Sequence, residues 1–397
     1  MKAEPRCSPH ELDLRIVLPS QVFGGAERTV LNLLEGMARL PTQPRVTLYG
    51  HADMLRPHLA GREDVAVVDV SGWGMGTSLR GLRSTRHDAR LLANHVATHR
   101  DRTAKTVVLG FLHYGAAMAV WMRRFLADQP RLSVIASPRG PSCAGIPMIS
   151  SDRTIRFLLH AHMALAGRWC DAVVVPSQGM RQELLTRYQG HPDRVVAIAN
   201  SYPTVADAIW HEYAVRAPRP ASAGTRFVMA TRLSAEKNIL LALEAFARHA
   251  PSHPEDTLTI VGDGPARAEI EANIAAHGLA RQVQVQPFQR EPFALIAQHD
   301  VYLHTCLIEG FGNSMIEALA VGVPVIATDC DFGPREIVMQ GINGLLVPQH
   351  DVAAFARAMA DIKTLPTERL RVAARDSAQI YTNFVMAARY VDVFCRV

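Results

Sequence analysis

The segment from Leu303 to Pro334 constrains the fold of this 397-residue chain more than any other. An apolar run, Val301–His304, enters a loop with two glycines, a helical pattern follows over Asn313–Ala320, and a second apolar run covers Val323–Ala327. Strand, glycine-rich loop, helix and strand make a βαβ unit, and in open α/β sheets ligands bind where such a strand meets its helix. The segment therefore predicts an α/β domain with a ligand at this loop, near the positive end of the helix.

Two carboxylates, Glu309 and Glu317, lie eight positions apart on either side of this loop. Both could face a ligand at the start of the helix. For Glu317 the alternative is a capping box with Ser314, in which the carboxylate bonds the first helical turn. The two roles are compatible. For Glu309 the alternative is a solvated loop acid, so the ligand role stays a hypothesis for both.

The sequence E-G-F-G-N-S-M-I-E, followed by A-L-A-V-G-V-P-V-I-A-T-D, resembles the E-x7-E motif of the family-4 retaining glycosyltransferases. That family has the GT-B fold, in which two Rossmann-like, doubly wound α/β domains face each other across a cleft. The resemblance extends to a glycine pair near the N-terminus and a basic pair near residue 235, so it covers nearly the whole chain. It implies a glycosyltransferase with a nucleotide-diphosphate sugar as donor.

The length of the chain favours two domains, because it exceeds what one ordinary core accommodates. The sequence R-A-P-R-P-A-S-A-G indicates a linker between them. We expect four parts: an acceptor-binding domain over 1–204, a linker over 205–224, a nucleotide-sugar-binding domain over 225–380, and a helix over 381–397. The resemblance implies that this last helix crosses back to the first domain.

The charge is distributed unevenly along the chain. Residues 1–205 carry 25 Lys+Arg and 16 Asp+Glu, a net charge of +9, while the remainder carries 17 and 21, a net charge of −4. The basic half is expected to meet an anionic partner. The basic segment Leu79–Lys105 is either an amphipathic helix on anionic lipid or an ordinary solvated helix face.

The apolar runs and the cysteines of the sequence bear on cellular location and on metal binding. No apolar run is long enough to span a membrane, and the polar start lacks the apolar core of a signal peptide, so a cytoplasmic location is the default expectation. The six cysteines show no C-x-x-C spacing, which argues against a zinc site. A peripheral position on the inner face of the cell membrane is compatible with both observations.

Three features of the first domain follow predicted strands. Gly24 and Gly25 lie between a strand and a helix start, a natural place for phosphate, and the alternative is a tight turn. His113 and Arg139 each follow a predicted strand on the ligand side of the sheet. Either could bind an acceptor. The alternatives are a satisfied structural histidine and an arginine paired with a surface acid.

In the second domain, Arg232 and Lys237 follow the strand Phe227–Ala230 within T-R-L-S-A-E-K-N. Two cations at this place suit a diphosphate, and the segment resembles the family's G-R-L-x-x-E-K-N. Thr231 replaces the usual glycine. Gly262 and Phe288, which follow the next two predicted strands, are weaker candidates for nucleotide contacts by the same resemblance.

Taken together, the resemblance implies catalytic roles for Glu309, Lys237 and Arg232, to which we add His113. The expected nucleotide-sugar contacts are Gly24, Gly25, Arg232, Lys237, Gly262, Phe288, Glu309, Gly310, Phe311, Gly312, Asn313, Ser314 and Glu317. No metal or other cofactor is expected, because Arg, Lys and helix-start N–H groups can neutralise the diphosphate.

The expected reaction is retaining transfer of a hexose or N-acetylhexosamine, with UDP as the assumed base, to a glycan or lipid-linked acceptor of the cell envelope. A partner nucleic acid is not expected. Two other hypotheses remain open. One is a nucleotide-sugar epimerase or a phosphorylase on the same fold, which would differ in acceptor. The other is a catalytically inactive sugar-nucleotide-binding subunit, which should lack the E-x7-E or Arg/Lys residues that are intact here.

Overall fold

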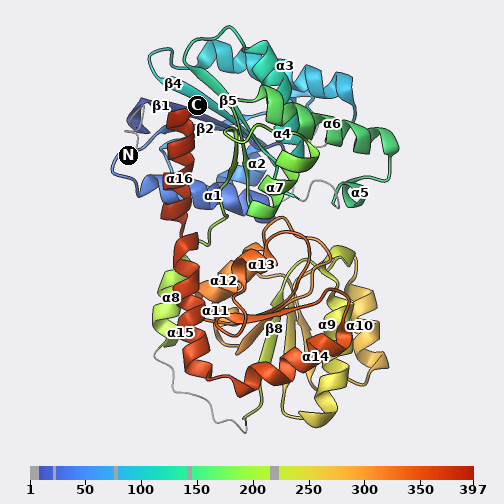
Figure 1. Ribbon diagram of the computed structural model, residues 1–397. Helices are drawn as coiled ribbons and strands as arrows, with labels where there is room; N and C mark the ends of the chain where they lie inside the picture. The colour runs from blue at the N-terminus through green and yellow to red at the C-terminus, as the bar shows by residue number, and fades with distance from the viewer. Residues whose placement is uncertain (1–8, 21–23, 76–78, 141–144, 215–222) are drawn as a thin grey trace. The chain divides into compact units, whose positions relative to one another are not determined.

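The computed structural model describes residues 9–20, 24–75, 79–140, 145–214 and 223–397 (Figure 1). The chain folds into two compact units: Met1–Ser201 with Asn383–Val397, and Tyr202–Thr382. Each unit has its own parallel sheet and its own hydrophobic cluster. The expected α/β class with two Rossmann-like units is therefore confirmed.

The sheet of the first unit has the strand order β3-β2-β1-β4-β5-β6-β7 within the described residues, and all its pairings are parallel. The order reverses between β1 and β4, which makes their carboxyl ends the switch point where ligands bind in such sheets. The strands are β1 (Leu12–Val17), β2 (Arg45–Gly50), β3 (Val65–Asp69), β4 (Lys105–Phe111), β5 (Leu132–Ser137), β6 (Ala172–Val175) and β7 (Val195–Ala197).

Helices cover both faces of this sheet (Figure 1). The central strands β1 and β4 are buried on both faces, and most of their residues are apolar. The helices are α1 (Gly25–Ala38), α2 (Ala52–Leu55), α3 (Leu82–His99), α4 (Leu112–Phe125), α5 (Ile146–Ile149), α6 (Arg153–Trp169), α7 (Gln178–Arg187) and α16 (Asn383–Arg396). Helices α1 and α16 pack together on one face, and α4 packs against both α3 and α6.

The end of the chain belongs to the first unit. Helix α16 places Tyr390 and Phe394 in the same buried cluster as Leu14 of β1. Helix α1 approaches it so closely at Gly36 that a Cβ there would overlap the carbonyl oxygen of Asn383. The amphipathic pattern of the last segment is therefore explained by packing within this unit.

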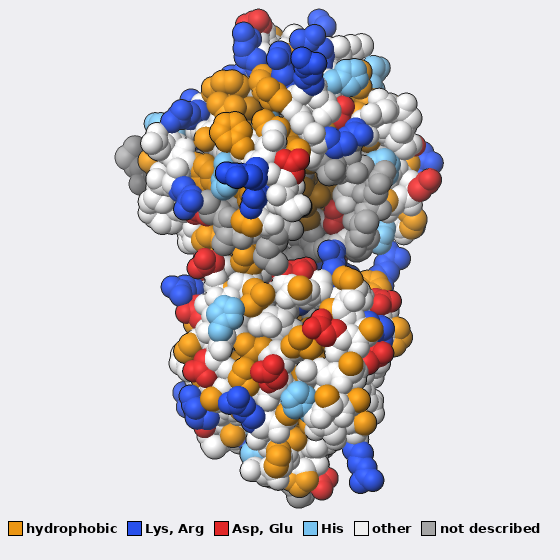
Figure 2. Space-filling model, turned by 90° about the vertical axis from the view of Figure 1, so that its right-hand side faces the viewer, with side chains coloured by type: hydrophobic (Ala, Val, Ile, Leu, Met, Phe, Trp, Pro, Cys, Tyr) orange, Lys and Arg blue, Asp and Glu red, His pale blue; other side chains and the backbone are white. Residues whose placement is uncertain are grey.

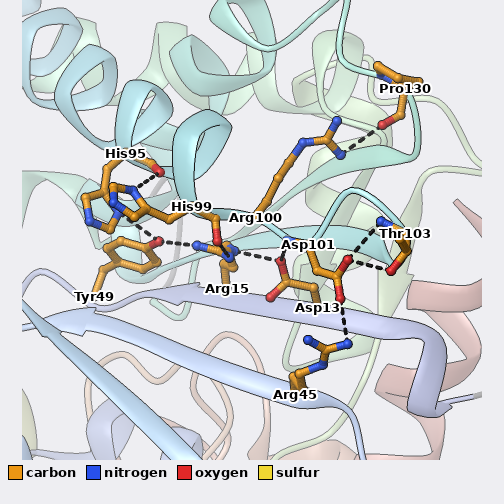
Figure 3. Close-up of polar contacts among 10 residues, drawn as sticks. All are labelled: Asp13, Arg15, Arg45, Tyr49, His95, His99, Arg100, Asp101, Thr103 and Pro130. Atoms are coloured by element: carbon orange, nitrogen blue, oxygen red, sulfur yellow. Dashed lines mark hydrogen bonds and ion pairs between the residues drawn. The ribbon is translucent and has the colours of Figure 1, made fainter.

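A buried polar network joins β1, β2 and α3 in the first unit (Figure 3). The Arg15 guanidinium donates to Asp13 Oδ2 at 2.9 Å, to Tyr49 Oη at 2.7 Å and to the carbonyl of His99 at 2.6 Å. His95 Nδ1 lies 3.2 Å from Tyr49 Oη, and its ring stacks on that of His99 at 4.0 Å. Arg15 is thus a buried cation whose charge and N–H groups are satisfied by the protein.

The sheet of the second unit has the order β10-β9-β8-β11-β12-β13, again with parallel pairings in the described part. Its order reverses between β8 and β11, so the exits of these two strands form the switch point of this unit. The strands are β8 (Arg226–Ala230), β9 (Thr257–Val261), β10 (Val283–Gln286), β11 (Val301–His304), β12 (Val325–Thr328) and β13 (Gly344–Val347).

Helices also cover both faces of the second sheet (Figure 1). Helices α9 and α14 pack together, as do α8, α11 and α12, and α15 packs on α12. The helices are α8 (Val205–Ala214), α9 (Ile239–His249), α10 (Arg267–Ala276), α11 (Phe293–Ala297), α12 (Asn313–Ala320), α13 (Pro334–Ile337), α14 (Val352–Asp361) and α15 (Thr367–Ala378). The predicted strand Val301–His304 and helix Asn313–Ala320 have the expected bounds.

The expected linker over 205–224 needs correction at its start. Residues 205–214 form α8, which packs on α11 and α12 within the second unit. Its Trp210 lies against Gly322, where a Cβ would overlap the indole ring. The apolar residues of α8 are spaced for a helix, and this pattern outweighs the prolines that come after it. The rest of the expected linker, 215–222, lies outside the described residues.

The expected basic helix over 79–105 is shorter than its sequence pattern. Helix α3 covers Leu82–His99, and its apolar residues, including Leu92 and Val96, are buried against the fold. The arginines of its first half are exposed. Within the described ranges, no helix combines the length and apolar character that crossing a bilayer requires.

Candidate functional site

Lys237 and Glu309 meet at the switch point of the second unit. Lys237 ends a 3-10 turn after β8, Glu309 lies in the loop after β11, and Lys237 Nζ donates to Glu309 Oε2 at 2.8 Å. Two further bonds tie the segments together: the Leu307 N–H to the carbonyl of Glu236 at 2.9 Å, and Thr305 Oγ1 to the carbonyl of Lys237 at 2.9 Å. Adjacent strands therefore bring together two residues that are 72 positions apart.

This ion pair is largely shielded from solvent, with side-chain exposures of 22% for Lys237 and 17% for Glu309. Burial alone would raise the pKa of Glu309, but the Lys237 ammonium and then His304 lower it to about 2. Burial also disfavours the Lys237 ammonium, yet the neighbouring Cys306 and Glu309 groups raise its pKa. Both partners are consequently charged at neutral pH.

His304 and Cys306 complete the cluster, and neither belonged to the sequence-based site prediction. His304 Nε2 lies 3.6 Å from Glu309 Oε2, and its Nδ1 lies 4.0 Å from Cys306 Sγ. Burial lowers the pKa of His304 to about 4 and raises that of the Cys306 thiol, so both are neutral at pH 7. Both lie at or just after the end of β11, where the strand-exit argument applied to His113 would have found them.

The same cluster offers ligand atoms for a cation. One nitrogen of His304, the Cys306 sulfur and one oxygen of Glu309 lie within 4.8 Å of one another. A divalent ion there would lie beside the Lys237 ammonium, which already pairs with Glu309, and the resulting repulsion disfavours it. The residues present therefore fit an ion pair better than a metal.

Helix α12 begins directly after this cluster. Gly312 is its N-cap with φ +107°, a conformation that favours glycine, and Gly310 and Phe311 before it are buried. Asn313 is thus the first helical residue. The capping box proposed for Ser314 and Glu317 would need Ser314 as the N-cap, but the N-cap of α12 is Gly312. Asn313 and Ser314 are half-buried, and Glu317 is buried on the helix.

The other predicted residues of the second unit differ in their surroundings. Arg232 is exposed in the loop after β8, and among the described residues its side chain makes no hydrogen bond or ion pair. Gly262 has a packing role, since a Cβ there would overlap the carbonyl oxygen of Thr231. Phe288 is 62% exposed and follows the edge strand β10, which two strands separate from β11. Arg232 therefore shares a loop with Lys237, whereas Phe288 stays apart from the pair.

In the first unit, Gly24 and Gly25 begin α1 as predicted from their place after β1. Gly24 is the N-cap, and its N–H donates to Glu27 Oε2 at 2.9 Å. A carboxylate of the helix itself therefore occupies part of the N-terminus that was expected to face phosphate. The preceding residues, 21–23, lie outside the described ranges.

His113 lies in the first turn of α4, beside the switch point of the first unit. Leu112 before it has φ +66°, a strained conformation for a residue with a branched side chain. His113 Nε2 is buried and meets no hydrogen-bond partner in the described part of the chain, and burial lowers the pKa of His113 to about 4. Arg139 follows the neighbouring strand β5 and is buried. Both residues stand at strand exits as expected, and Arg139 is not a surface residue.

Comparison with known proteins identifies two family models along the chain. Residues 23–204 match Glycosyltransferase Family 4, and residues 216–379 match Glycosyl transferases group 1. The matched ranges correspond to the two units of the fold, and together they take in most of the chain.

Individual curated relatives match only part of the chain. The Streptomyces coelicolor protein "Exopolysaccharide phosphotransferase SCO2592" is 31% identical over 198 residues, which are 48% of this chain and 19% of that protein. The Bacillus subtilis "Poly(glycerol-phosphate) alpha-glucosyltransferase" is 30% identical over 135 residues, 34% of this chain and 20% of the relative. The chain thus spans about a fifth of the length of these curated relatives.

Among solved structures, Anabaena Alr3699/HepE in complex with UDP is similar with a TM-score of 0.71 and 17% identity. The similarity covers 97% of this chain and 100% of that one, which shows a shared fold over both units. The two family models, the two Rossmann-like sheets and this shared fold agree, and the chain belongs to the group 1 and family 4 glycosyltransferases.

Proposed function

We propose that the protein is a retaining glycosyltransferase that moves a hexose or N-acetylhexosamine from a UDP-sugar to a glycan or lipid-linked acceptor. The pathway we propose is cell-envelope polysaccharide or lipopolysaccharide synthesis. The observation that carries the proposal is the charged Lys237–Glu309 pair at the second switch point, directly before the start of α12.

The comparisons support the donor and the acceptor class. HepE, which shares the fold, was solved with UDP, and two relatives carry names of exopolysaccharide and poly(glycerol-phosphate) enzymes. Both names refer to a polymer, and the assignment of that polymer to the cell envelope is part of our proposal. The choice of UDP over other bases rests on HepE and is the part of the proposal that a binding panel tests first.

The chemistry of the pair suits departure of a nucleoside diphosphate. Breaking the bond between the anomeric carbon and the diphosphate oxygen leaves the electron pair, and therefore growing negative charge, on the diphosphate. Arg232 and Lys237 supply positive charge, and Lys237 has further N–H groups besides the one that Glu309 accepts. The backbone N–H groups at the start of α12 add to this field.

Glu309 has two tasks in this mechanism. Its Oε2 accepts a hydrogen bond from Lys237, and a carboxylate has further lone pairs that can accept from the hydroxyls of the donor sugar. Glu317 on α12 bonds the ribose. The acceptor hydroxyl attacks the anomeric carbon on the face that the diphosphate leaves, and its proton passes to a diphosphate oxygen. Configuration is thereby retained, and no metal enters any step.

Thermal unfolding with UDP, GDP, ADP and CMP, with and without a chelator, tests the donor site. A ligand that binds only the folded state stabilises it by about 2.7 kcal/mol at a hundred times its dissociation constant. We expect stabilisation by UDP that the chelator does not change. Stabilisation by a different nucleotide would overturn the choice of UDP as the donor nucleotide. Stabilisation that the chelator abolishes would overturn the metal-free mechanism.

Glu309→Ala and Lys237→Ala test the transferase chemistry itself. Each is expected to abolish sugar transfer while the far-ultraviolet circular dichroism stays that of the wild type. Near-normal turnover in either variant would refute the assignment. Turnover that requires inorganic phosphate would favour a phosphorylase, and UDP binding without any turnover would favour an inactive binding subunit.

We further propose that the enzyme works in the cytoplasm, peripheral on the inner face of the cell membrane. The first unit contains the basic part of the chain, and Figure 2 shows a hydrophobic patch bordered by Lys and Arg side chains on its surface. The apolar residues Leu92 and Val96 of α3 are buried within the fold, so the exposed face that this helix offers lipid is rich in arginine. Pelleting with anionic liposomes at low and moderate salt tests the contact, and binding that salt does not weaken would contradict it.

A further inference from the structure

Arg139 is a buried cation without an anionic partner. The residue is 8% exposed. Its Nη1 donates to Tyr390 Oη at 3.2 Å and to Ser137 Oγ at 3.3 Å, and its Cζ lies 4.9 Å from the centroid of the Phe111 ring. Nε and Nη2 are buried and, among the described residues, meet no hydrogen-bond acceptor. Burial lowers the pKa of Arg139, and Tyr390 opposes this, but a guanidinium stays charged at neutral pH.

The other buried arginines are satisfied differently. Of the four arginines below a tenth exposed in the described residues, Arg15 and Arg375 each pair with a carboxylate, and Arg100 donates to a backbone carbonyl and a side-chain amide. Of these four described arginines, Arg139 alone has neither a carboxylate nor a carbonyl oxygen, because both its acceptors are hydroxyl groups. A buried charge without compensation is strongly unfavourable, so this arginine calls for another partner.

The position of Arg139 is that of a ligand contact. It follows β5, whose last residue pairs with the last residue of β4, and β4 adjoins the switch point of the first unit. The next residue, Gly140, lies against the His113 ring, since a Cβ there would be 2.7 Å from His113 Cε1. His113 Nε2 is itself buried without a partner in the described residues. Two adjacent strand exits thus present unsatisfied polar atoms at the ligand edge of one sheet.

The atoms that lack a partner define the chemistry of what binds. Nε and Nη2 form one edge of the planar guanidinium, and their two N–H groups are parallel, which matches two oxygens of one phosphate or carboxylate. We propose that this edge of Arg139 binds an oxyanion of a substrate at the exits of β4 and β5. Such a ligand would supply both the missing acceptors and the missing negative charge.

The oxyanion has two sources, and only their assignment rests on the proposed function. One is the diphosphate of the donor. The other is a phosphate or carboxylate on the acceptor, so that Arg139 would select an anionic acceptor. Binding of an oxyanion by Arg139 stands on the burial and hydrogen bonding of the first unit alone.

The experiment compares the full-length wild type with Arg139→Met and Arg139→Lys, with inorganic pyrophosphate as the probe in titration calorimetry. We expect Arg139→Met to bind pyrophosphate at least tenfold more weakly, and Arg139→Lys to be intermediate because it keeps the charge but loses the paired N–H edge. Arg124→Met, which removes an exposed arginine of the same unit, is the matched control and should bind like the wild type. Equal affinity in wild type and Arg139→Met would overturn the proposal.

Stability without ligand separates a binding arginine from a structural one. Replacing an uncompensated buried charge by an apolar side chain of similar length is expected to leave the unfolding temperature unchanged or higher. Arg139→Met should therefore have an unfolding temperature no lower than that of the wild type, while its affinity for pyrophosphate falls. A clear fall in its unfolding temperature would identify a structural arginine and refute the proposal.

UDP distinguishes the two sources. If Arg139 binds the donor, UDP displaces pyrophosphate, and Arg139→Met weakens UDP as well. If Arg139 binds the acceptor, pyrophosphate still binds in the presence of saturating UDP, and Arg139→Met keeps its UDP affinity. If the wild type binds no nucleotide and Arg139→Met weakens pyrophosphate binding, the proposed donor is refuted and the oxyanion site at Arg139 is supported.

Discussion

Protonation of His304 should make the second unit sensitive to acid. The imidazole is 4% exposed, and burial lowers its pKa from 6.5 to about 4, with Glu309 opposing and Lys237 reinforcing that shift. The unfolded chain therefore takes up a proton below pH 6.5 that the folded protein refuses until about pH 4. The stabilising effect of this difference is complete above pH 6.5 and is lost as the pH falls.

The size of the effect follows from the two pKa values. Each pH unit between them changes the free energy of unfolding by about 1.4 kcal/mol, so at pH 5.0 the loss from this one residue is about 2 kcal/mol. His304→Gln carries no titrating group at this position. Between pH 7.5 and pH 5.0, the wild type should lose about 2 kcal/mol more stability than His304→Gln does.

The assay is urea unfolding at both pH values, followed by pulsed hydrogen exchange of peptides that contain β11 and β12. Comparing each protein with itself removes the constant effect of the substitution, and only the dependence on pH remains. His277→Gln, at an exposed position in the same unit, is the control and should lose as much stability as the wild type. An equal loss in the wild type and in His304→Gln would refute the reasoning.

Two further predictions concern contacts of the same unit. Lys237→Met and Glu309→Gln should each lower the free energy of unfolding by about 1–3 kcal/mol, because each change leaves a partly buried charge unpaired. The double variant should lose about 1 kcal/mol less than the sum of the two single losses. Additive losses in denaturant titrations would contradict this coupling. Gly333→Ala should be less stable than Gly341→Ala by about 1–3 kcal/mol, since both glycines have positive φ but only the Cβ at Gly333 would overlap the carbonyl oxygen of Phe311. Calorimetric melting of both variants checks the second prediction, and equal losses would refute the steric explanation.

Local patterns were sufficient for the elements around the site. The apolar run before the glycines predicted β11, and the helical spacing between Gly312 and Gly322 predicted α12 with its observed bounds. Such elements depend on bonds and side-chain periodicity within a few residues. The linker expected at 205–214 is a helix for the same local reason, because the apolar spacing within this segment is helical and the prolines come only after it.

The composition of the cluster at Glu309 was predicted only in part. Glu309 and Lys237 were expected to serve one donor site, but their direct ion pair depends on β8 and β11 being neighbours. His304 ends the predicted strand and Cys306 follows it two positions later, but only the structure shows that both are buried and therefore neutral. Phe288 has the expected place after its strand, yet the strand order sets it apart from the pair.

By itself, then, the sequence determined the class of the fold, the strand exits that carry polar residues, and the glycine loop before α12, because each is encoded in neighbouring residues. Only the tertiary structure decided which exits lie side by side and which charges are compensated. Arg15 and Arg139 are both arginines at or near buried strands, but one lies beside Asp13 and the other meets only hydroxyl groups. Desolvation and pairing act between residues that are distant in the chain, and they give the same side chain a structural role in one place and an open binding edge in another.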